Sequence, residues 1–328
     1  MEENLVRQSG FPFRGIPAAG LHGVGIRNLP GNLFQLMKGI SASHRILQEF
    51  RPDVLLFTGG YVAVPMAIAG KSFPSLLYVP DIEPGLALKT LARRATVIAL
   101  TSEESRQFFK SKKRMIVTGY PTRSDLSKWT RTDAMKKMGC VKNKQILLVL
   151  GGSQGARSIN RALFPILPEL LQTCQVIHIS GELDQQEAIN VRSTLTQDQK
   201  NDYHLFSYLH DDIGAALASA DLVVSRAGAS ILGEYPLFGL PSILIPYPYA
   251  WRYQKINADY LIKHGAAVLV KNENLQDELL PKIKDLLSNP EVLHKMSSAS
   301  KALAQPDAAK KLAALVVGLV PKGATNHG

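Results

Sequence analysis

The chain has 328 residues, enough for two domains of about 100–200 residues each. Hydrophobic residues make up 45% and charged residues 20%, a globular composition that excludes long disordered regions. The formal net charge of +11 predicts an anionic partner, such as nucleic acid, a phosphorylated substrate or an anionic lipid surface.

Cysteine usage and hydropathy exclude several further classes. The two cysteines, Cys140 and Cys174, form no CxxC pair, so neither a zinc site nor a disulfide framework is predicted. The first ten residues are polar and acidic at their start, which does not fit a signal peptide. No run of 18 apolar residues is free of charge, so no transmembrane helix is predicted. Any contact of the protein with a membrane is therefore expected at the membrane surface.

The first residues do not read as the start of a doubly wound domain, which opens with a strand and a phosphate-binding turn. Met1–Ser9 instead resembles the end of a helix, with Gly10 as its stop. Phe11–Ile16 then reads as a strand.

Short apolar runs and helical patterns alternate along the rest of the chain. Nearly continuous Val, Ile and Leu residues are typical of strands buried on both faces of a parallel sheet. Two sets of such runs favour two doubly wound domains, which we expect at 1–124 and 125–328, with the last helix packing back on the first domain. The predicted strands are Asp53–Thr58, Ser75–Val79, Thr96–Leu100, Arg114–Thr118, Gln145–Leu150, Gln175–Ser180, Asp221–Ser225 and Pro241–Pro246.

The first motif, Leu147–Asn160, is a buried strand that leads into the turn Gly151-Gly152-Ser153-Gln154-Gly155 and then a helix. Glycines let the backbone approach a phosphate, and the helix N-terminus offers free N–H groups. Such turns also occur for packing alone. The spacing is not GxGxxG, which disfavours a dehydrogenase, and no Gly-Lys-Ser/Thr follows, so it is no P-loop.

The second motif, Asp221–Glu234, repeats this arrangement with the turn Ala227-Gly228-Ala229-Ser230. Glu234 lies one helical turn after Ser230, where its carboxylate can accept hydrogen bonds from ribose hydroxyls. The alternative is a solvated helix glutamate.

The third motif, Ile245–Asn257, is a strand end rich in proline, followed by Arg252, Gln254 and Asn257. Amide side chains both donate and accept hydrogen bonds, which suits sugar hydroxyls. Gln254 and Asn257 are three residues apart and therefore share a helix face.

Together these motifs resemble the MurG family of glycosyltransferases, and the resemblance covers nearly the whole chain. It implies a GT-B fold, with two Rossmann-like parallel-sheet domains facing a cleft, and an inverting transfer that needs no cofactor or bound metal. The matching residues are Gly151–Arg157 with Asn160, Ser225–Ser230 with Glu234, Gln254 with Asn257, Gly15–Gly20, Pro52–Val54 and Thr58–Val62.

The resemblance also implies donor-site roles. Glu234 would hold the ribose, Gln254 and Asn257 would read the GlcNAc hydroxyls, and Arg226 would neutralise the leaving diphosphate. Ala229, Ser230 and Ser153 would hold the UDP phosphates. Further residues would also bind UDP-GlcNAc: Gln154, Asn160 and Gly228 of the same motifs, Arg123 at the border of the cleft, and His210 in a segment whose backbone contacts uracil.

For the acceptor, the resemblance implies that the turn Gly59-Gly60-Tyr61 faces the pyrophosphate of an undecaprenyl-linked muramyl-pentapeptide, lipid I. The family's first Gly-rich turn, with its histidine, has no counterpart, so we expect an N-terminal domain incomplete at its start and donor binding stronger than turnover. The family's His-Glu-Gln-Asn stretch reads Tyr78-Val79-Pro80-Asp81 here, which leaves Asp81 as the candidate base, and Ile231 replaces a threonine.

We therefore expect a transferase that converts lipid I to lipid II in peptidoglycan synthesis, binds no nucleic acid, and lies peripherally on the cytoplasmic face of the cell membrane. Apolar residues at helical spacing in Leu29–Lys38, with Arg27, Lys38 and Arg45, predict contact with anionic lipid, although a core-facing helix gives the same pattern. The alternatives are a non-catalytic or split-subunit UDP-sugar-binding protein and a lipid glycosyltransferase with another acceptor.

Overall fold

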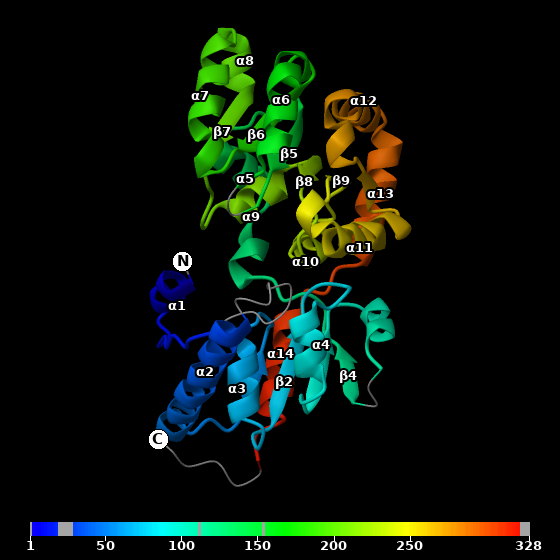
Figure 1. Cartoon of the computed structure of the whole chain (residues 1–328). Helices are drawn as coiled ribbons and strands as arrows, with labels where there is room; N and C mark the ends of the chain where they lie inside the picture. The colour runs from blue at the N-terminus through cyan, green and yellow to red at the C-terminus, as the bar shows by residue number, and fades with distance from the viewer. Residues whose placement is uncertain (1, 19–28, 111–112, 153–154, 322–328) are drawn as a thin grey trace.

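The computed structural model describes residues 2–18, 29–110, 113–152 and 155–321. It contains two parallel sheets, which lie in the lower and upper halves of Figure 1. The N-terminal sheet has the strand order β1-β2-β3-β4, and the C-terminal sheet has the order β10-β9-β8-β5-β6-β7. All strand pairs are parallel, so the expected pair of doubly wound α/β units is confirmed.

The N-terminal sheet is covered by helices on both faces. Leu77, Ile98 and Leu100 pack on one face of it, and Leu76 and Val97 pack on the other. The strands are β1 (Leu55–Phe57), β2 (Ser75–Val79), β3 (Val97–Leu100) and β4 (Arg114–Val117). The helices before and between them are α1 (Glu2–Gln8), α2 (Leu29–Phe50), α3 (Ala63–Ala69), α4 (Leu86–Ala92) and the 3₁₀ helix η2 (Glu103–Phe108).

The C-terminal sheet lies between two larger apolar clusters, one on each face. Its strands are β5 (Gln145–Leu150), β6 (Cys174–Ile179), β7 (Tyr203–Phe206), β8 (Leu222–Ser225), β9 (Ser242–Leu244) and β10 (Ala267–Leu269). Its helices are α5 (Arg131–Met138), α6 (Arg157–Leu170), α7 (Gln185–Thr194), α8 (Gln197–Asp202), α9 (Ile213–Ser219), α10 (Ile231–Phe238), α11 (Trp251–Lys263), α12 (Leu275–Leu287) and α13 (Pro290–Ala302). Short 3₁₀ helices are η3 (Ser124–Lys128), η4 (Glu182–Asp184), η5 (Pro248–Ala250) and η6 (Asn272–Asn274).

The start of the chain corrects one prediction. The helix before Gly10 is present as α1, and Gly10 has a φ of +80°, as a helix stop requires. The predicted strand Phe11–Ile16 is wrong, because these residues form no regular structure and pair with no described strand. Pro12 lacks an N–H group to donate, so an apolar pattern alone does not produce a strand here.

The last helix, α14 (Ala308–Val317), crosses back to the N-terminal sheet (Figure 1). Leu312, Leu315 and Val316 pack against the cluster of Leu76, Tyr78 and neighbouring strand residues. The connection between the sheets, residues 118–144, contains η3 and α5, and α5 packs against α9 of the C-terminal half. We keep residue 124 as our proposed domain boundary.

Polar side chains join the two halves directly. Glu83, whose side chain is 1% exposed, follows β2 and receives hydrogen bonds from Arg252 Nε and Nη2 of α11 at 2.8 and 2.6 Å. Lys89 Nζ of α4 lies 3.1 Å from the same carboxylate. The Arg252 hydrogen bond, followed by that of Lys89, outweighs burial and holds the pKa of Glu83 below its usual value. Across the described part of the chain, no helix is both long and apolar enough to cross a membrane.

Candidate functional site

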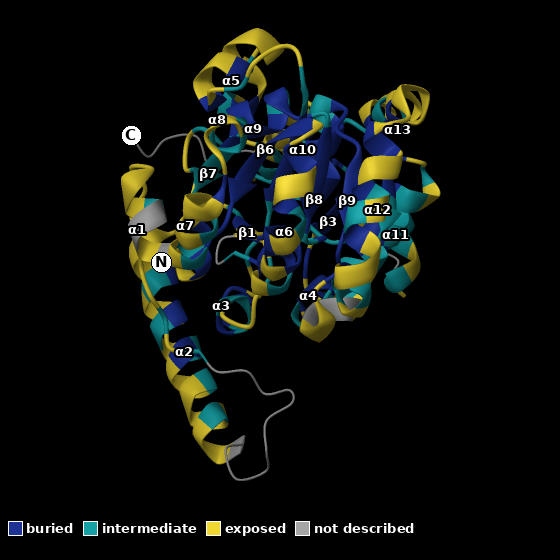
Figure 2. Cartoon of the chain, turned by 90° about the horizontal axis from the view of Figure 1, so that it is seen from above, coloured by how far each residue is buried: buried dark blue, intermediate teal, exposed yellow. Residues whose placement is uncertain are grey.

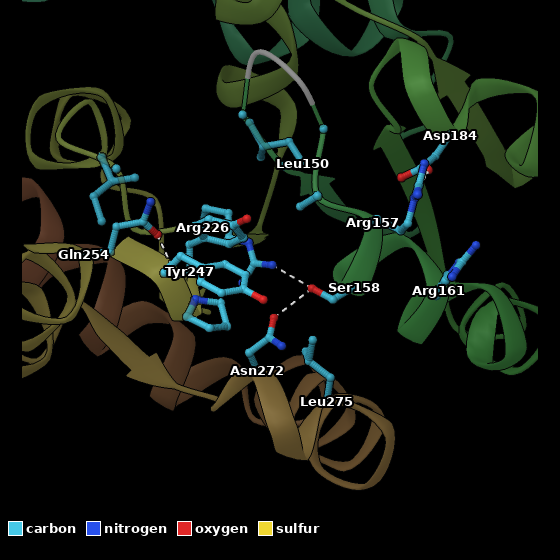
Figure 3. Close-up of a pocket in the computed structure, with 18 of the residues that line it drawn as sticks. Leu150, Arg157, Ser158, Arg161, Asp184, Arg226, Tyr247, Gln254, Asn272 and Leu275 are labelled. Atoms are coloured by element: carbon cyan, nitrogen blue, oxygen red, sulfur yellow. Dashed lines mark hydrogen bonds and ion pairs between the residues drawn. The ribbon is translucent and has the colours of Figure 1, made fainter. Parts of the chain in front are cut away.

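A cavity of about 1020 Å³ lies at the carboxyl ends of the C-terminal strands, where all three sequence motifs meet (Figure 3). The chain runs from β5 outward to β6 and β7, and then returns to β8 on the other side of β5. Ligands of doubly wound sheets bind at such a reversal of strand order. Motif residues that line the cavity include Gly151, Gly152, Gly155, Arg226, Gly228, Ser230, Glu234 and Gln254.

The first turn requires glycine for steric reasons. A Cβ atom on Gly151 would lie 2.2 Å from the carbonyl carbon of Gly155. Gly155 has a φ of +79°, and a Cβ atom there would lie 2.5 Å from the Ser180 carbonyl oxygen. A side chain at either position would push the turn apart, so these glycines keep its backbone close to the cavity wall.

The second turn presents free backbone donors. The N–H groups of Gly228, Ala229 and Ser230, directly before α10, have no hydrogen-bond partner among the described residues. Three adjacent unpaired amides at a helix start are a typical phosphate-binding arrangement. These three residues therefore stay our candidates for binding the donor phosphates.

Arg226 is a half-buried cation without a carboxylate partner among the described residues. Its Nη1 donates to the Ile245 and Pro246 carbonyl oxygens at 3.1 and 3.4 Å, and its guanidinium lies 5.2 Å from the centre of the Tyr247 ring. Burial lowers the pKa of Arg226 to about 10. A guanidinium withdrawn from water beside free amides indicates an anionic ligand.

Glu234 lies in the first turn of α10, as predicted, and lines the cavity. Burial raises its carboxyl pKa above the usual value, although a hydrogen bond with Ser230 and the positive charge of Arg123 oppose the shift. A half-buried carboxylate gains more from ligand hydroxyl donors than an exposed one would.

Gln254 lines the cavity with its carboxamide. Its Oε1 accepts hydrogen bonds from the backbone N–H groups of Tyr247 and Ala227, at 2.8 and 3.3 Å. Its Nε2 has no partner among the described residues. Gln254 therefore joins the second and third motifs and keeps two N–H donors for a ligand.

Two amides predicted for the donor site, Asn257 and Asn160, bond to groups of the protein itself. Asn257 is completely buried: its Oδ1 accepts from Ile82 N–H at 3.0 Å, and its Nδ2 donates to Asp81 at 2.8 Å and to Ala227 O at 3.3 Å. It fastens the N-terminal half to the second turn and does not reach the cavity.

Asn160 is likewise buried, and its Nδ2 donates to the Ser180 carbonyl and to Asp184, both at 2.8 Å. Its Oδ1 lies 3.0 Å from Nε2 of His178, whose pKa burial lowers to about 3, so that ring stays neutral and donates. Asn160 therefore holds Asp184, a residue of the cavity wall, through a hydrogen bond from the protein interior.

Other predicted residues lie around the cavity or outside the description. Arg123 Nη2 donates a hydrogen bond to the His210 carbonyl oxygen at 3.0 Å, which holds the two residues together. Neither of them is among the residues that line the cavity. The His210 ring packs edge-on against Tyr208. Ser153 and Gln154 lie outside the described residues.

The residues predicted for the acceptor lie in the other half of the chain. The turn after β1 contains Gly59 and Gly60, whose φ values of +116° and +77° favour glycine, and Tyr61 is exposed beside them. Asp81 follows β2 at the contact with α11, and burial raises its pKa despite the hydrogen bond from Asn257. A carboxylate with a raised pKa is a stronger base.

Several lining residues were missed by sequence reasoning. Arg157, Ser158 and Arg161 lie in the first turns of α6, where their spacing after the Gly-rich turn was a usable signal. Asp184, Tyr247 and Asn272 also line the cavity. Asp184 and Asn272 come from segments without a motif, and only the fold brings them to this site.

Two doubly wound units, the second with a phosphate-type cavity at its strand reversal, have the architecture of the GT-B fold. The pattern of the Glycosyltransferase family 28 C-terminal domain matches residues 146–312, and that of the N-terminal domain matches residues 1–100.

A transferase of Roseiflexus sp. (strain RS-1) is 40% identical, with 98% of this chain and 82% of the relative covered. One of Thermoanaerobacter sp. (strain X514) is 35% identical, covering 96% and 88%. Both are named UDP-N-acetylglucosamine--N-acetylmuramyl-(pentapeptide) pyrophosphoryl-undecaprenol N-acetylglucosamine transferase. The chain belongs to this family of glycosyltransferases.

Solved structures agree in fold. MurG of Acinetobacter baumannii superposes with a TM-score of 0.75 at 23% identity, covering 97% of this chain and 88% of that one. The UDP-GlcNAc 2-epimerase of Neisseria meningitidis, solved with UDP-GlcNAc, gives 0.65 at 13% identity, covering 97% and 88%. The expected GT-B fold is therefore confirmed.

Proposed function

We propose that the chain transfers N-acetylglucosamine from UDP-GlcNAc to the muramyl 4-hydroxyl of undecaprenyl-pyrophosphoryl-MurNAc-pentapeptide, converting lipid I to lipid II. The observation that carries the proposal is Arg226, a half-buried cation beside three free amides in the cavity of a family member. The names of the relatives favour this reaction over non-catalytic donor binding or another acceptor.

The donor would lie with its diphosphate against Gly228–Ser230 and Arg226, and with its ribose against Glu234. In an inverting step, the acceptor oxygen attacks the anomeric carbon, and the bond to the diphosphate breaks. Its electron pair passes to the UDP oxygen, which gains a negative charge. Arg226 and the free amides would stabilise that charge, because they are already oriented before it develops.

The acceptor hydroxyl must lose its proton in the same step. We propose Asp81 as the base, because it lies at the contact between the two halves and its raised pKa favours proton capture. The acceptor pyrophosphate would face Gly59–Tyr61 across the contact.

The experiment that tests the function measures radiolabelled GlcNAc transfer from UDP-GlcNAc to a lipid I analogue. Asp81→Asn keeps an oxygen that can accept from Asn257 but removes the base, so we expect turnover to fall by about 10²–10⁴-fold. Asp259→Asn, the same change at a half-exposed position of α11 where the carboxylate pairs with Lys255, is the matched control. No transfer by the wild-type chain would overturn the proposal, and full activity of Asp81→Asn would overturn the base assignment.

For location, we propose peripheral binding to the cytoplasmic face of the cell membrane through α2. Leu33, Phe34 and Met37 are exposed on its first turns, which extend beyond the rest of the molecule in Figure 2. Lys38 Nζ lies 4.4 Å from the centre of the Phe34 ring, which places a cation beside this apolar face. Arg27 lies outside the described residues.

Vesicle flotation tests this location. A basic residue near an anionic surface contributes about 1 kcal/mol, screened by salt, so binding should require anionic lipid and weaken at high salt. Phe34→Glu should abolish flotation, whereas Gln35→Glu, an exposed neighbour with the same added charge, should reduce it less. Equal loss in both variants would exclude a specific role of the apolar face.

A further inference from the structure

Two residues to which the resemblance assigns no role hold the Arg226 guanidinium in place (Figure 3). Ser158 lies in the first turn of α6, and Asn272 begins η6, directly before α12. Arg226 Nη2 lies 2.6 Å from Ser158 Oγ, and Ser158 Oγ lies 2.7 Å from Asn272 Oδ1. Segments 68 and 114 residues from Ser158 in sequence therefore meet at one hydroxyl group.

The chemistry of the three groups fixes the direction of both hydrogen bonds. A guanidinium donates and never accepts, so Ser158 Oγ accepts from Arg226. The single hydroxyl proton of Ser158 is then donated to Asn272 Oδ1. Asn272 is thus required as an acceptor, and the oriented Ser158 dipole presents its oxygen lone pairs to the cation.

These contacts leave a defined part of the guanidinium for a ligand. Of its five N–H groups, those on Nη1 bond the Ile245 and Pro246 carbonyls, and one on Nη2 bonds Ser158. The Nε–H group and the second Nη2–H group have no partner among the described residues. Without Ser158, only the contacts of Nη1 would hold the guanidinium, and these two donors could turn away from their direction.

We infer that Ser158 and Asn272 are positioning residues for Arg226 in the transfer reaction, an inference that rests on the proposed function. The diphosphate oxygen gains charge as the glycosidic bond breaks, so a displaced guanidinium costs more in the transition state than in the donor complex. Loss of positioning therefore lowers kcat more than it raises the donor KM.

Kinetics of Ser158→Ala and Asn272→Ala test the inference. One hydrogen bond to a charged group corresponds to a loss of about tenfold, so we expect kcat to fall by that factor and the KM for UDP-GlcNAc to change by less than about threefold. Ser158→Thr keeps the hydroxyl and should retain most activity. Ser288→Ala, the same change at an exposed site, is the control. An unchanged stoichiometry of UDP binding in calorimetry separates lost positioning from lost folded protein.

The deciding variants combine each change with Arg226→Ala. If Ser158 and Asn272 act through Arg226, the double variants lose no more transfer activity or UDP affinity than Arg226→Ala alone. Independent, multiplying losses would overturn the inference, as would full activity of Ser158→Ala. A wild-type chain that binds UDP but transfers no sugar would contradict the proposed function instead, and the UDP affinities of the double variants would still decide the positioning role.

Discussion

Arg226 beside the cavity and Glu83 at the contact between the two halves are both charged groups withdrawn from water, but their surroundings differ. Glu83 is bonded by two cations, Arg252 and Lys89. Arg226 has only neutral oxygens and an aromatic ring around it among the described residues. The paired charge of Glu83 therefore stabilises the structure. The charge of Arg226 has no anion within the protein to offset its desolvation, so it indicates where an anionic ligand binds.

Replacement of Arg226 gives the largest effect that this comparison predicts. Removal of one preorganised donor for developing charge typically costs about 10²–10³-fold in kcat, and we expect Arg226→Ala to lose transfer activity to that extent. Its thermal stability should not fall, because the variant no longer holds a cation without an anion. Arg226→Lys keeps the positive charge, so its transfer activity should lie between those of wild type and Arg226→Ala. A strongly destabilised Arg226→Ala protein would show that this cation is structural.

For Glu83→Gln we expect a loss of stability, in contrast to Arg226→Ala. A hydrogen bond to a charged group contributes about 1.5–3 kcal/mol, so the free energy of unfolding should fall by about 2 kcal/mol at neutral pH. The loss stays moderate because the Arg252 side chain is 72% exposed and can be hydrated when the carboxylate is gone.

The effect of Glu83 should also depend on pH. The folded-state pKa of Glu83 is lowered, so its stabilisation is present above the unfolded pKa and disappears as pH falls through the folded pKa. Denaturation curves of wild type and Glu83→Gln should therefore converge in acid. A constant difference at every pH would contradict the ion-pair account.

Donor affinity is the next effect in size. Glu234→Ala removes a carboxylate that we place on the ribose, and UDP should bind about tenfold more weakly in calorimetry. Glu169→Ala, which removes a surface carboxylate paired with Lys284, is the control. Unchanged UDP affinity in folded Glu234→Ala would remove the ribose assignment.

The smallest effect concerns the stability cost of Glu234 itself. Its folded pKa is raised, so the unfolded chain loses its proton first as pH rises, and stability declines over that interval. Glu234→Gln should therefore be slightly more stable than wild type at neutral pH and equal to it in acid. Lower stability of Glu234→Gln at neutral pH would show that the carboxylate has a structural partner.

The sequence predicted the sheets better than the contacts between them. All eight strands predicted between residues 53 and 246 are present, with ends shifted by up to two residues, because buried parallel strands have a strong apolar pattern. The short strands β7 and β10 were not identified. The pattern at Phe11–Ile16 predicted a strand that does not form, since a strand needs a neighbour to pair with.

In the candidate site, too, the sequence predicted local motifs but not contacts between residues that are distant in sequence. The glycine turns, Arg226, Glu234 and Gln254 meet at one cavity as their motifs predicted. Asn160 and Asn257 have the same amide chemistry as a sugar-reading residue, yet they bond the protein itself. Their partners lie 24 and 176 residues away in sequence, so no local pattern could reveal them.

The affinities of UDP and uridine for wild type and Arg226→Ala, measured by calorimetry, test the central claim most directly. If the unpaired cation binds the donor diphosphate, Arg226→Ala should bind UDP at least about tenfold more weakly, because a charge-assisted hydrogen bond is lost. Uridine, which lacks phosphate, should bind both proteins equally. Equal losses for the two ligands, or no loss for UDP, would contradict the assignment of this cavity to the diphosphate.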